Sequence, residues 1–170
     1  GLYGPFFVCY SNSMQQDYRD QLNSAKRIVV KVGTHVLVNS DGRPNKARIA
    51  HLVEQLAALH KAGKEVVLVS SGAIGAGLKK LGYKKRPHHL PEVQMAAAVG
   101  QAQLTALYAA LFTKHKITIS QVLLTHADLR ERTRHLNARN AMLACLEHGV
   151  IPVVNENDVV SVDEIRVGDN

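Results

Sequence analysis

A lysine lies inside an otherwise apolar run near the start of the ordered pattern. Lys31 follows the β-branched residues 28–30 and precedes Val32 and Gly33. A buried ammonium is unfavourable unless an anion or carboxylate meets it, so Lys31 indicates an anion-binding site. The alternative is an edge-strand lysine that faces water. Gly33 would let a ligand approach the backbone closely, and Thr34 adds a hydroxyl group.

A second candidate is the glycine-rich segment 71–77, which follows an apolar run. Backbone N–H groups in such a strand-to-helix turn can hold a carboxylate or a phosphate, with Ser71 and Gly72 nearest to it. The segment matches neither the P-loop pattern nor the dinucleotide-binding pattern. Tight packing between a helix and a strand explains the glycines equally well. No His or Asp partner lies near Ser71 in the sequence, which favours a binding serine over a nucleophile.

Amide and carboxylate side chains gather after a third apolar run. They include Asn155, Asn157 and Asp158, and Asp169 and Asn170 end the chain. An amino-acid ligand needs acceptors for its ammonium group and donors for its carboxylate, and such side chains supply both. An ordinary loop is the alternative, because Asn and Asp are common loop residues.

The remaining reactive residue types form no pattern of their own. The nine histidines are dispersed without metal-ligand spacing, so the sequence predicts no protein-bound metal site. Cys145 shares an apolar helix face with Met142 and Leu146, which favours a core role. A basic cluster over residues 79–89 lacks, apart from Tyr83, the interleaved aromatics of a nucleic-acid surface. We interpret it as a solvated loop, with contact to an anion or a partner as the alternative.

The elements that must position these residues alternate along the chain. Strands are expected at residues 28–33, 66–69, 117–124 and 150–154, and the first of them is interpreted as a buried parallel strand. Residues 36–38 are expected to extend it or to pair with it. Helices are expected from the N-cap Asn45, after Gly72, over residues 91–114 and before Gly149. This alternation predicts an α/β fold with a parallel sheet covered by helices. Ligands bind at the carboxyl edge of such sheets, where all three candidate segments lie.

Length and composition set the remaining limits. The chain has 170 residues, a formal net charge of +7 and 21% charged residues, which is typical of one globular core. No run was found that is long and apolar enough to predict a membrane span. Two cysteines make no disulfide framework, which favours a reducing, cytoplasmic location. Residues 1–13 differ in character and precede Met14, so residues 1–25 are interpreted as an appended extension before one domain at 26–170.

Five strings together resemble the glutamate 5-kinases of the amino-acid kinase family. They are RIVVKVGTHVLV, EVVLVSSGAIGAG, MAAAVGQAQL, RTRHLNARNAM and IPVVNENDVVSVDEIRVGDN, in this order from about Arg27 to Asn170. The second and fifth strings separate glutamate kinases from the acetylglutamate and aspartate kinases that share the fold. The resemblance implies a three-layer αβα sandwich with a mainly parallel sheet.

The resemblance also implies a reaction and a set of site residues. The family transfers the γ-phosphoryl group of ATP, with Mg²⁺, to the γ-carboxylate of L-glutamate, which is the first step of proline biosynthesis. Lys31 matches the catalytic lysine, and Gly33, Thr34 and Asp169 would lie at the phosphate. The matching glutamate-binding positions are Ser71, Gly72, Asp158 and Asn170. Because a carboxylate is already a nucleophile at neutral pH, no general base is required.

The resemblance has two further implications, for inhibition by proline and for the part of the family domain that this chain covers. The loop over residues 123–140, with Asp128, Arg139 and Asn140, matches a region linked to proline inhibition, and a homo-oligomer is expected. Family domains continue past the VGDN string into a nucleotide-binding half, so residues 26–170 correspond to the substrate-binding portion, from which no turnover is expected by itself. The alternative function is a non-catalytic lobe or scaffold that binds glutamate or proline. A basic nucleic-acid module ranks last, since no recognition motif is present.

Overall fold

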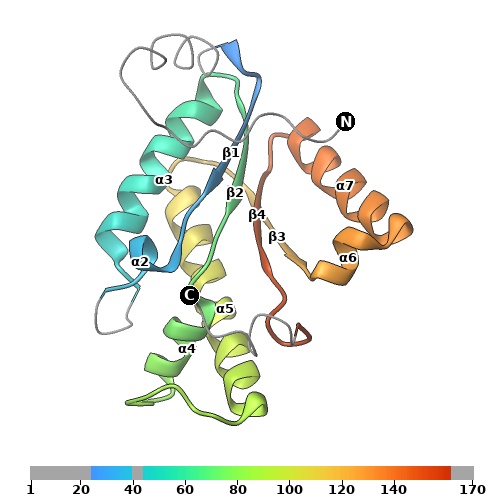
Figure 1. Cartoon of the computed structure of the whole chain (residues 1–170). Helices are drawn as coiled ribbons and strands as arrows, with labels where there is room; N and C mark the ends of the chain where they lie inside the picture. Colours follow the sequence, from blue (N-terminus) through green and yellow to red (C-terminus); the bar gives the residue numbers. More distant parts are fainter. Residues whose placement is uncertain (1–23, 40–43, 162–170) are drawn as a thin grey trace, which may run out of the picture.

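Four parallel strands form one sheet in the computed structural model, which describes residues 24–39 and 44–161. Across the sheet they are β1 (Arg27–Lys31), β2 (Glu65–Val69), β4 (Ile151–Glu156) and β3 (Ile119–Leu124). All neighbouring pairs are parallel, with Lys31 beside Val69 and Val69 beside Val154. The carboxyl ends of β1, β2 and β4 therefore meet at one edge, as predicted (Figure 1).

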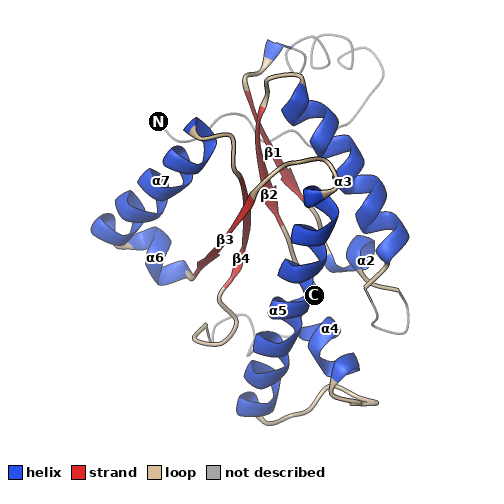
Figure 2. Cartoon of the chain, turned by 180° about the vertical axis from the view of Figure 1, so that it is seen from behind, coloured by secondary structure: helices blue, strands red, loops and turns tan. Residues whose placement is uncertain are grey.

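Helices cover both faces of this sheet, which confirms the three-layer arrangement (Figures 1 and 2). The helices α3 (Lys46–Lys61) and α5 (Leu90–Thr113) lie on one face, and α6 (His126–Arg130) and α7 (Arg132–Glu147) lie on the other. Neighbouring residues of β3 show the two sides. Ile119 packs against the main core, whereas the hydroxyl of Ser120 accepts a hydrogen bond from Cys145 of α7 at 3.3 Å.

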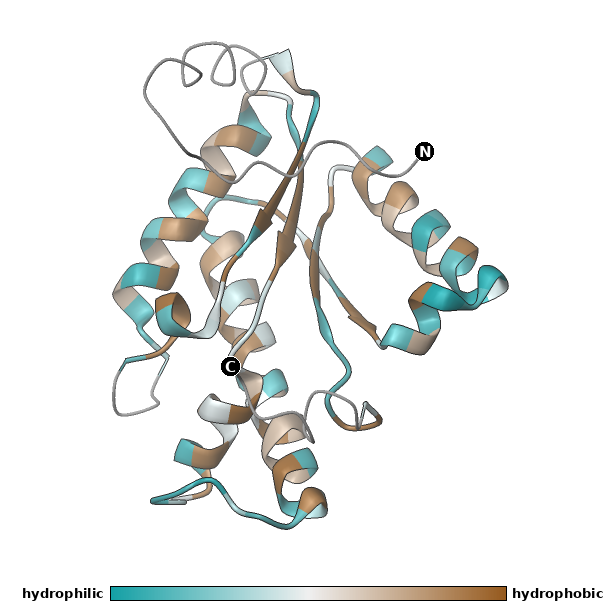
Figure 3. Cartoon of the chain, viewed as in Figure 1, coloured by the Kyte–Doolittle hydropathy of each residue, from teal (hydrophilic) through white to brown (hydrophobic). Residues whose placement is uncertain are grey.

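The main core lies between the sheet and the helices α3 and α5. Its apolar side chains include Ile49, Val53, Leu56, Val66, Leu68, Leu104, Tyr108, Phe112, Ile151 and Val153. Helix α3 begins as expected, because the Asn45 side chain accepts a hydrogen bond from the Arg48 N–H. Figure 3 shows the brown, hydrophobic residues of the central strands between helices whose outer surfaces carry hydrophilic residues.

Two glycines fix how α4 (Ala73–Lys80) packs on α5. A Cβ atom on Gly100 would lie 1.8 Å from the Ala73 carbonyl oxygen, and one on Gly77 would lie 1.7 Å from the Ala96 carbonyl oxygen. The helix backbones are therefore in direct contact, and no larger residue fits between them. Figure 1 shows α4 and the first half of α5 extending beyond the carboxyl edge of the sheet.

We expect Gly100→Ala to lower the free energy of unfolding by about 2 kcal/mol, because the new methyl group forces the two backbones apart. Urea denaturation measures this change. Gly75→Ala, on the same helix pair, is the control, since a Cβ at Gly75 meets no atom within 4 Å. This control should raise stability by about 0.5 kcal/mol. Equal losses in both variants would contradict the close-packing argument.

The structure corrects three local expectations. First, β1 was interpreted as a buried strand, yet it lies at the edge of the sheet and Val29 is 52% exposed. Lys31 is exposed too, as in the edge-strand alternative, so its ammonium group is not buried. Second, residues 36–38 do not extend β1. The segment forms the short helix α2 (Thr34–Leu37), and Val38 then makes an isolated antiparallel bridge with Pro44. Third, α6 is a separate helix that the sequence analysis did not predict.

Helix α5 also qualifies the expectation of no membrane span. It has 24 residues and a mean hydropathy of 1.3, and within the described ranges it is the one helix long and apolar enough to cross a membrane. Its residues Leu104, Tyr108 and Phe112 are buried in the main core, however. A core helix passes the same test of length and composition, and 39% of the apolar window of α5 is buried in this structure.

Candidate functional site

An open cleft of about 610 Å³ lies at the carboxyl edge of the sheet. The ends of β1, β2 and β4, the start of α4 and the loop after α4 line it, through residues that include Lys31, Thr34, Ser71, Gly72, Arg86, Asn155, Glu156 and Asp158. Its volume suits a small ligand. A smaller hollow of about 210 Å³ lies at the amino ends of β2 and β4 and includes His60 and Gly149. The polar residues singled out from the sequence converge on the larger cleft.

Hydroxyl groups and a helix start form one wall of the cleft. Thr34 Oγ1 and Ser71 Oγ lie 2.9 Å apart, which joins the segments after β1 and β2 by a hydrogen bond. Gly72 then takes a φ of +88°, a backbone conformation that L side chains rarely adopt, and it is the N-cap of α4. The first N–H groups of α4 have no partner within the helix, so this wall can bind an anion.

Two cations reach the cleft from different segments. Lys31 is exposed at the end of β1, and its Nζ lies 3.9 Å from the position that a Cβ atom on Gly33 would take. The ammonium group is therefore folded back over the Gly33 backbone. Arg86 comes from the exposed loop between α4 and α5 and also lines the cleft. The Lys31 charge favours an anionic ligand group beside the end of β1, whereas the Arg86 charge acts on Asp158.

Carboxylates and an amide form the opposing wall after β4. Asn155 is 8% exposed and donates a hydrogen bond from Nδ2 to Gln101 Oε1 at 2.7 Å. Burial raises the pKa of the Asp158 carboxyl to about 6, the Glu156 carboxylate also raises it, and the Arg86 guanidinium opposes them. Glu156 accepts a hydrogen bond from the Ser161 hydroxyl. This wall therefore offers acceptors for a cationic group.

Comparison with known families agrees with this arrangement. The family described as the amino acid kinase family matches residues 26–170 of the chain. The chain belongs to the amino-acid kinase family. Its all-parallel sheet and flanking helices are consistent with the fold of that family.

Curated relatives of this amino-acid kinase chain carry the name glutamate 5-kinase. The chain is 54% identical over 144 residues to the protein from Herpetosiphon aurantiacus and 49% identical over 152 residues to that from Aromatoleum aromaticum. It is 49% identical over 156 residues to the protein from Moorella thermoacetica. These matches cover 85%, 89% and 92% of the chain but 39% to 41% of the relatives, so the chain spans about two-fifths of their length.

The predicted site residues of this amino-acid kinase chain fall into three groups. Lys31, Thr34, Ser71, Gly72 and Asp158 all line the cleft. Gly33 lies under the Lys31 ammonium group rather than in the cleft wall. The predicted residues 169 and 170 lie outside the described residues.

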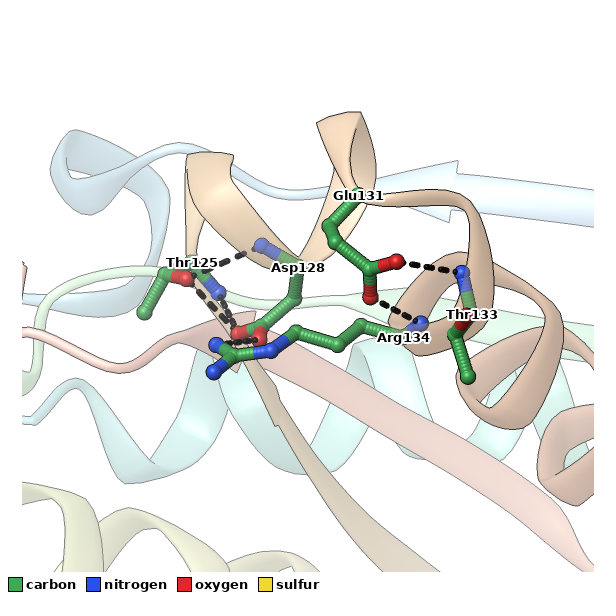
Figure 4. Close-up of polar contacts among 5 residues, drawn as sticks. All are labelled: Thr125, Asp128, Glu131, Thr133 and Arg134. Atoms are coloured by element: carbon green, nitrogen blue, oxygen red, sulfur yellow. Dashed lines mark hydrogen bonds and ion pairs between the residues drawn. The ribbon is translucent and has the colours of Figure 1, made fainter.

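The predicted control loop lies on α6 and α7, and none of Asp128, Arg139 and Asn140 lines the cleft. Asp128 makes its contacts with neighbouring residues at the start of α6 and α7, as Figure 4 shows. Its carboxylate accepts hydrogen bonds from the Thr125 N–H and hydroxyl and pairs with Arg134 at 3.1 Å. Hydrogen bonds from Thr125 and the charge of Arg134 lower the pKa of this carboxyl. A role in proline inhibition stays a prediction.

Sequence reasoning missed two residues that line the cleft and a third that lies behind it. Arg86 was part of the basic cluster interpreted as a solvated loop, although contact with an anion was the alternative. Glu156 was quoted within the polar segment but was not selected. Gln101 received no attention, although it contacts Asn155 directly. The sequence feature that could have indicated Gln101 is a polar side chain inside an apolar helix. In the structure this position of α5 faces the ends of the strands.

Proposed function

We propose that this chain forms the glutamate-binding part of an ATP-dependent glutamate 5-kinase. The reaction would transfer the γ-phosphoryl group of ATP to the γ-carboxylate of L-glutamate, giving L-glutamyl 5-phosphate and ADP, the first step toward proline. The observation that carries the proposal is a single cleft lined by Lys31 at the end of β1, by the start of α4 after β2, and by Glu156 and Asp158 at the end of β4. Relatives named glutamate 5-kinase support the same substrate.

The two walls suit the two ends of an amino acid. The ammonium group of glutamate would meet the carboxylate of Asp158 and the amide oxygen of Asn155. A carboxylate of glutamate would accept hydrogen bonds from the Ser71 hydroxyl and from the N–H groups that begin α4. These opposed charges would orient the substrate so that its reacting carboxylate points toward Lys31.

The main contribution of this chain to phosphoryl transfer would be charge stabilisation by Lys31. Bound ATP supplies the γ-phosphoryl group, and the carboxylate oxygen of glutamate forms the new bond as the bond to ADP breaks. The Lys31 ammonium would neutralise negative charge on the transferring group. The described part of the chain contains no group of three or more His, Cys, Asp or Glu side chains that could hold a metal. Mg²⁺ would accompany the phosphates of ATP and neutralise part of their charge.

Hydroxamate formation tests the proposal. The intact protein that contains this chain is incubated with ATP, Mg²⁺, L-glutamate and hydroxylamine, which traps an acyl phosphate. We expect a hydroxamate product that requires both glutamate and ATP. Glutamate binding without product would favour the non-catalytic binding lobe, and absence of both would contradict the assignment of the cleft. Inhibition by proline, association into a homo-oligomer and a cytoplasmic location stay predictions.

A further inference from the structure

One face of α5 carries polar side chains that contact the carboxyl edge of the sheet. Gln94, Gln101 and Tyr108 are spaced by seven residues, so they lie on the same side of the helix. Their hydrogen bonds are Gln94 Nε2 to the Val159 carbonyl at 2.8 Å, Gln101 Oε1 from Asn155 Nδ2 at 2.7 Å, and Tyr108 OH with Ser70 Oγ at 3.2 Å. The helix therefore supports the cleft from behind.

The hydrogen bond between Gln101 and Asn155 belongs to a short chain of hydrogen bonds that runs in one direction. The hydroxyl of Thr105 has one hydrogen, and it donates that hydrogen to Gln121 Oε1 at 2.6 Å. Thr105 Oγ1 therefore accepts from Gln101 Nε2, at 3.1 Å. This places Gln101 Oε1 toward Asn155, so that the Nδ2 of Asn155 is the atom that faces α5.

The orientation of the Asn155 amide follows from this chain. Because Nδ2 points to Gln101, the Oδ1 of Asn155 is the end of the amide left for other contacts. It has no hydrogen-bond partner within the described ranges, and it is not sealed from solvent. Asn155 also lines the cleft. A free amide oxygen is an acceptor, and an ammonium group is a donor without acceptor capacity.

We propose that Gln101 is a positioning residue that holds the Asn155 amide with its oxygen toward the cleft, and so confers preference for substrates that carry an α-ammonium group. This inference rests on the proposed function. Gln101 does not touch the substrate and acts through Asn155. With an inverted amide, Asn155 would present N–H groups to the ammonium group, and the two donors would repel each other.

The test compares two ligands that differ only in the ammonium group. L-glutamate carries it, and glutarate has the same chain and both carboxylates without it. Gln101→Met removes both hydrogen bonds at nearly constant volume, and we expect the Kd for glutamate in the intact protein to rise about tenfold. The inhibition constant of glutarate should stay within twofold. Calorimetry for glutamate and competition for glutarate measure the two values.

Two further variants separate orientation from simple packing. Gln101→Glu keeps an acceptor for Asn155 Nδ2, so it should restore most of the lost glutamate affinity. Thr105→Val removes the hydroxyl that fixes the direction of the chain, so both orientations of the Gln101 amide become equally available. The competent fraction then falls to about one half, and the Kd for glutamate should rise about twofold. If Gln101→Met fails to fold, the Kd of Thr105→Val for glutamate still tests the inference.

Gln103→Met is the matched control on the same helix, because Gln103 makes no hydrogen bond in the part of the chain that the structure describes. It should bind both ligands as the unaltered protein does. The inference is overturned if Gln101→Met keeps its affinity for glutamate, or if glutarate and glutamate weaken equally. Failure of the unaltered protein to bind glutamate would instead overturn the proposed function, so the two failures are distinguishable.

Discussion

Lys31→Met is expected to lower the rate of glutamyl phosphate formation about 1000-fold while the affinity for glutamate changes less than twofold. The ammonium group contributes when charge develops on the transferring phosphoryl group, and methionine keeps the length of the side chain without the charge. Lys31 ends β1, which β2 separates from β4 and from the Asp158 wall that we assign to the substrate ammonium. Hydroxamate formation and glutamate calorimetry separate the two effects.

The control for this prediction is Lys61→Met, which removes an exposed lysine at the end of α3 and should leave the rate unchanged. Both variants alter exposed side chains, so their free energies of unfolding should stay within about 0.5 kcal/mol of the unaltered protein. If the rate of Lys31→Met is close to that of Lys61→Met, Lys31 has no role in the phosphoryl transfer. A large loss of glutamate affinity would make it a substrate-binding residue instead.

The sequence predicted the order of the elements well because its apolar runs are separated by clear helix signals. The runs of β2 and β4 are central strands, with Val66, Leu68, Ile151 and Val153 buried as expected. The run of β1 looks the same in the sequence but lies at the edge of the sheet. Strand order depends on how distant segments pair, so an apolar run alone could not show that Val29 is exposed.

The site was predictable wherever a residue follows a strand directly. Lys31, Ser71 and Asp158 reach one cleft because parallel strands end at a common edge. Arg86 lies in a loop between two helices, and the path of that loop follows from the Gly77 and Gly100 contact between α4 and α5. This contact depends on the fold as a whole. The role of Gln101 likewise requires knowing which face of α5 meets Asn155.

Asp158→Asn is expected to raise the Kd for glutamate about 100-fold at pH 7.5, since it removes the charge opposite the substrate ammonium group. The same change should remove a pH dependence. The pKa of Asp158 is raised to about 6 in the free protein, so about one tenth of the carboxyl is ionised at pH 5. Glutamate should therefore bind the unaltered protein about tenfold more weakly at pH 5 than at pH 7.5.

Asp158→Asn should lower the affinity for glutamate but raise the free energy of unfolding above pH 6. Because burial holds the pKa of Asp158 above its ordinary value, the folded protein keeps this proton between about pH 4 and 6 while the unfolded chain releases it. The contribution of the neutral group to stability is complete below about pH 4 and is lost as the pH rises through 6. Asparagine cannot ionise, so Asp158→Asn should be more stable above pH 6, by about 1 kcal/mol for a partly exposed group.

Paired measurements of affinity and unfolding test this prediction across pH 4 to 8. Glu147→Gln, at an exposed position of α7 and without an ion pair in the described part of the chain, is the control and should match the unaltered protein in both. A variant that loses affinity and stability together would indicate a structural role for Asp158. If affinity falls while stability rises, the fold keeps the ionised Asp158 carboxylate in surroundings that destabilise its charge. The ammonium group of the substrate would then supply the stabilisation that the free protein lacks, and binding near pH 6 would release the proton.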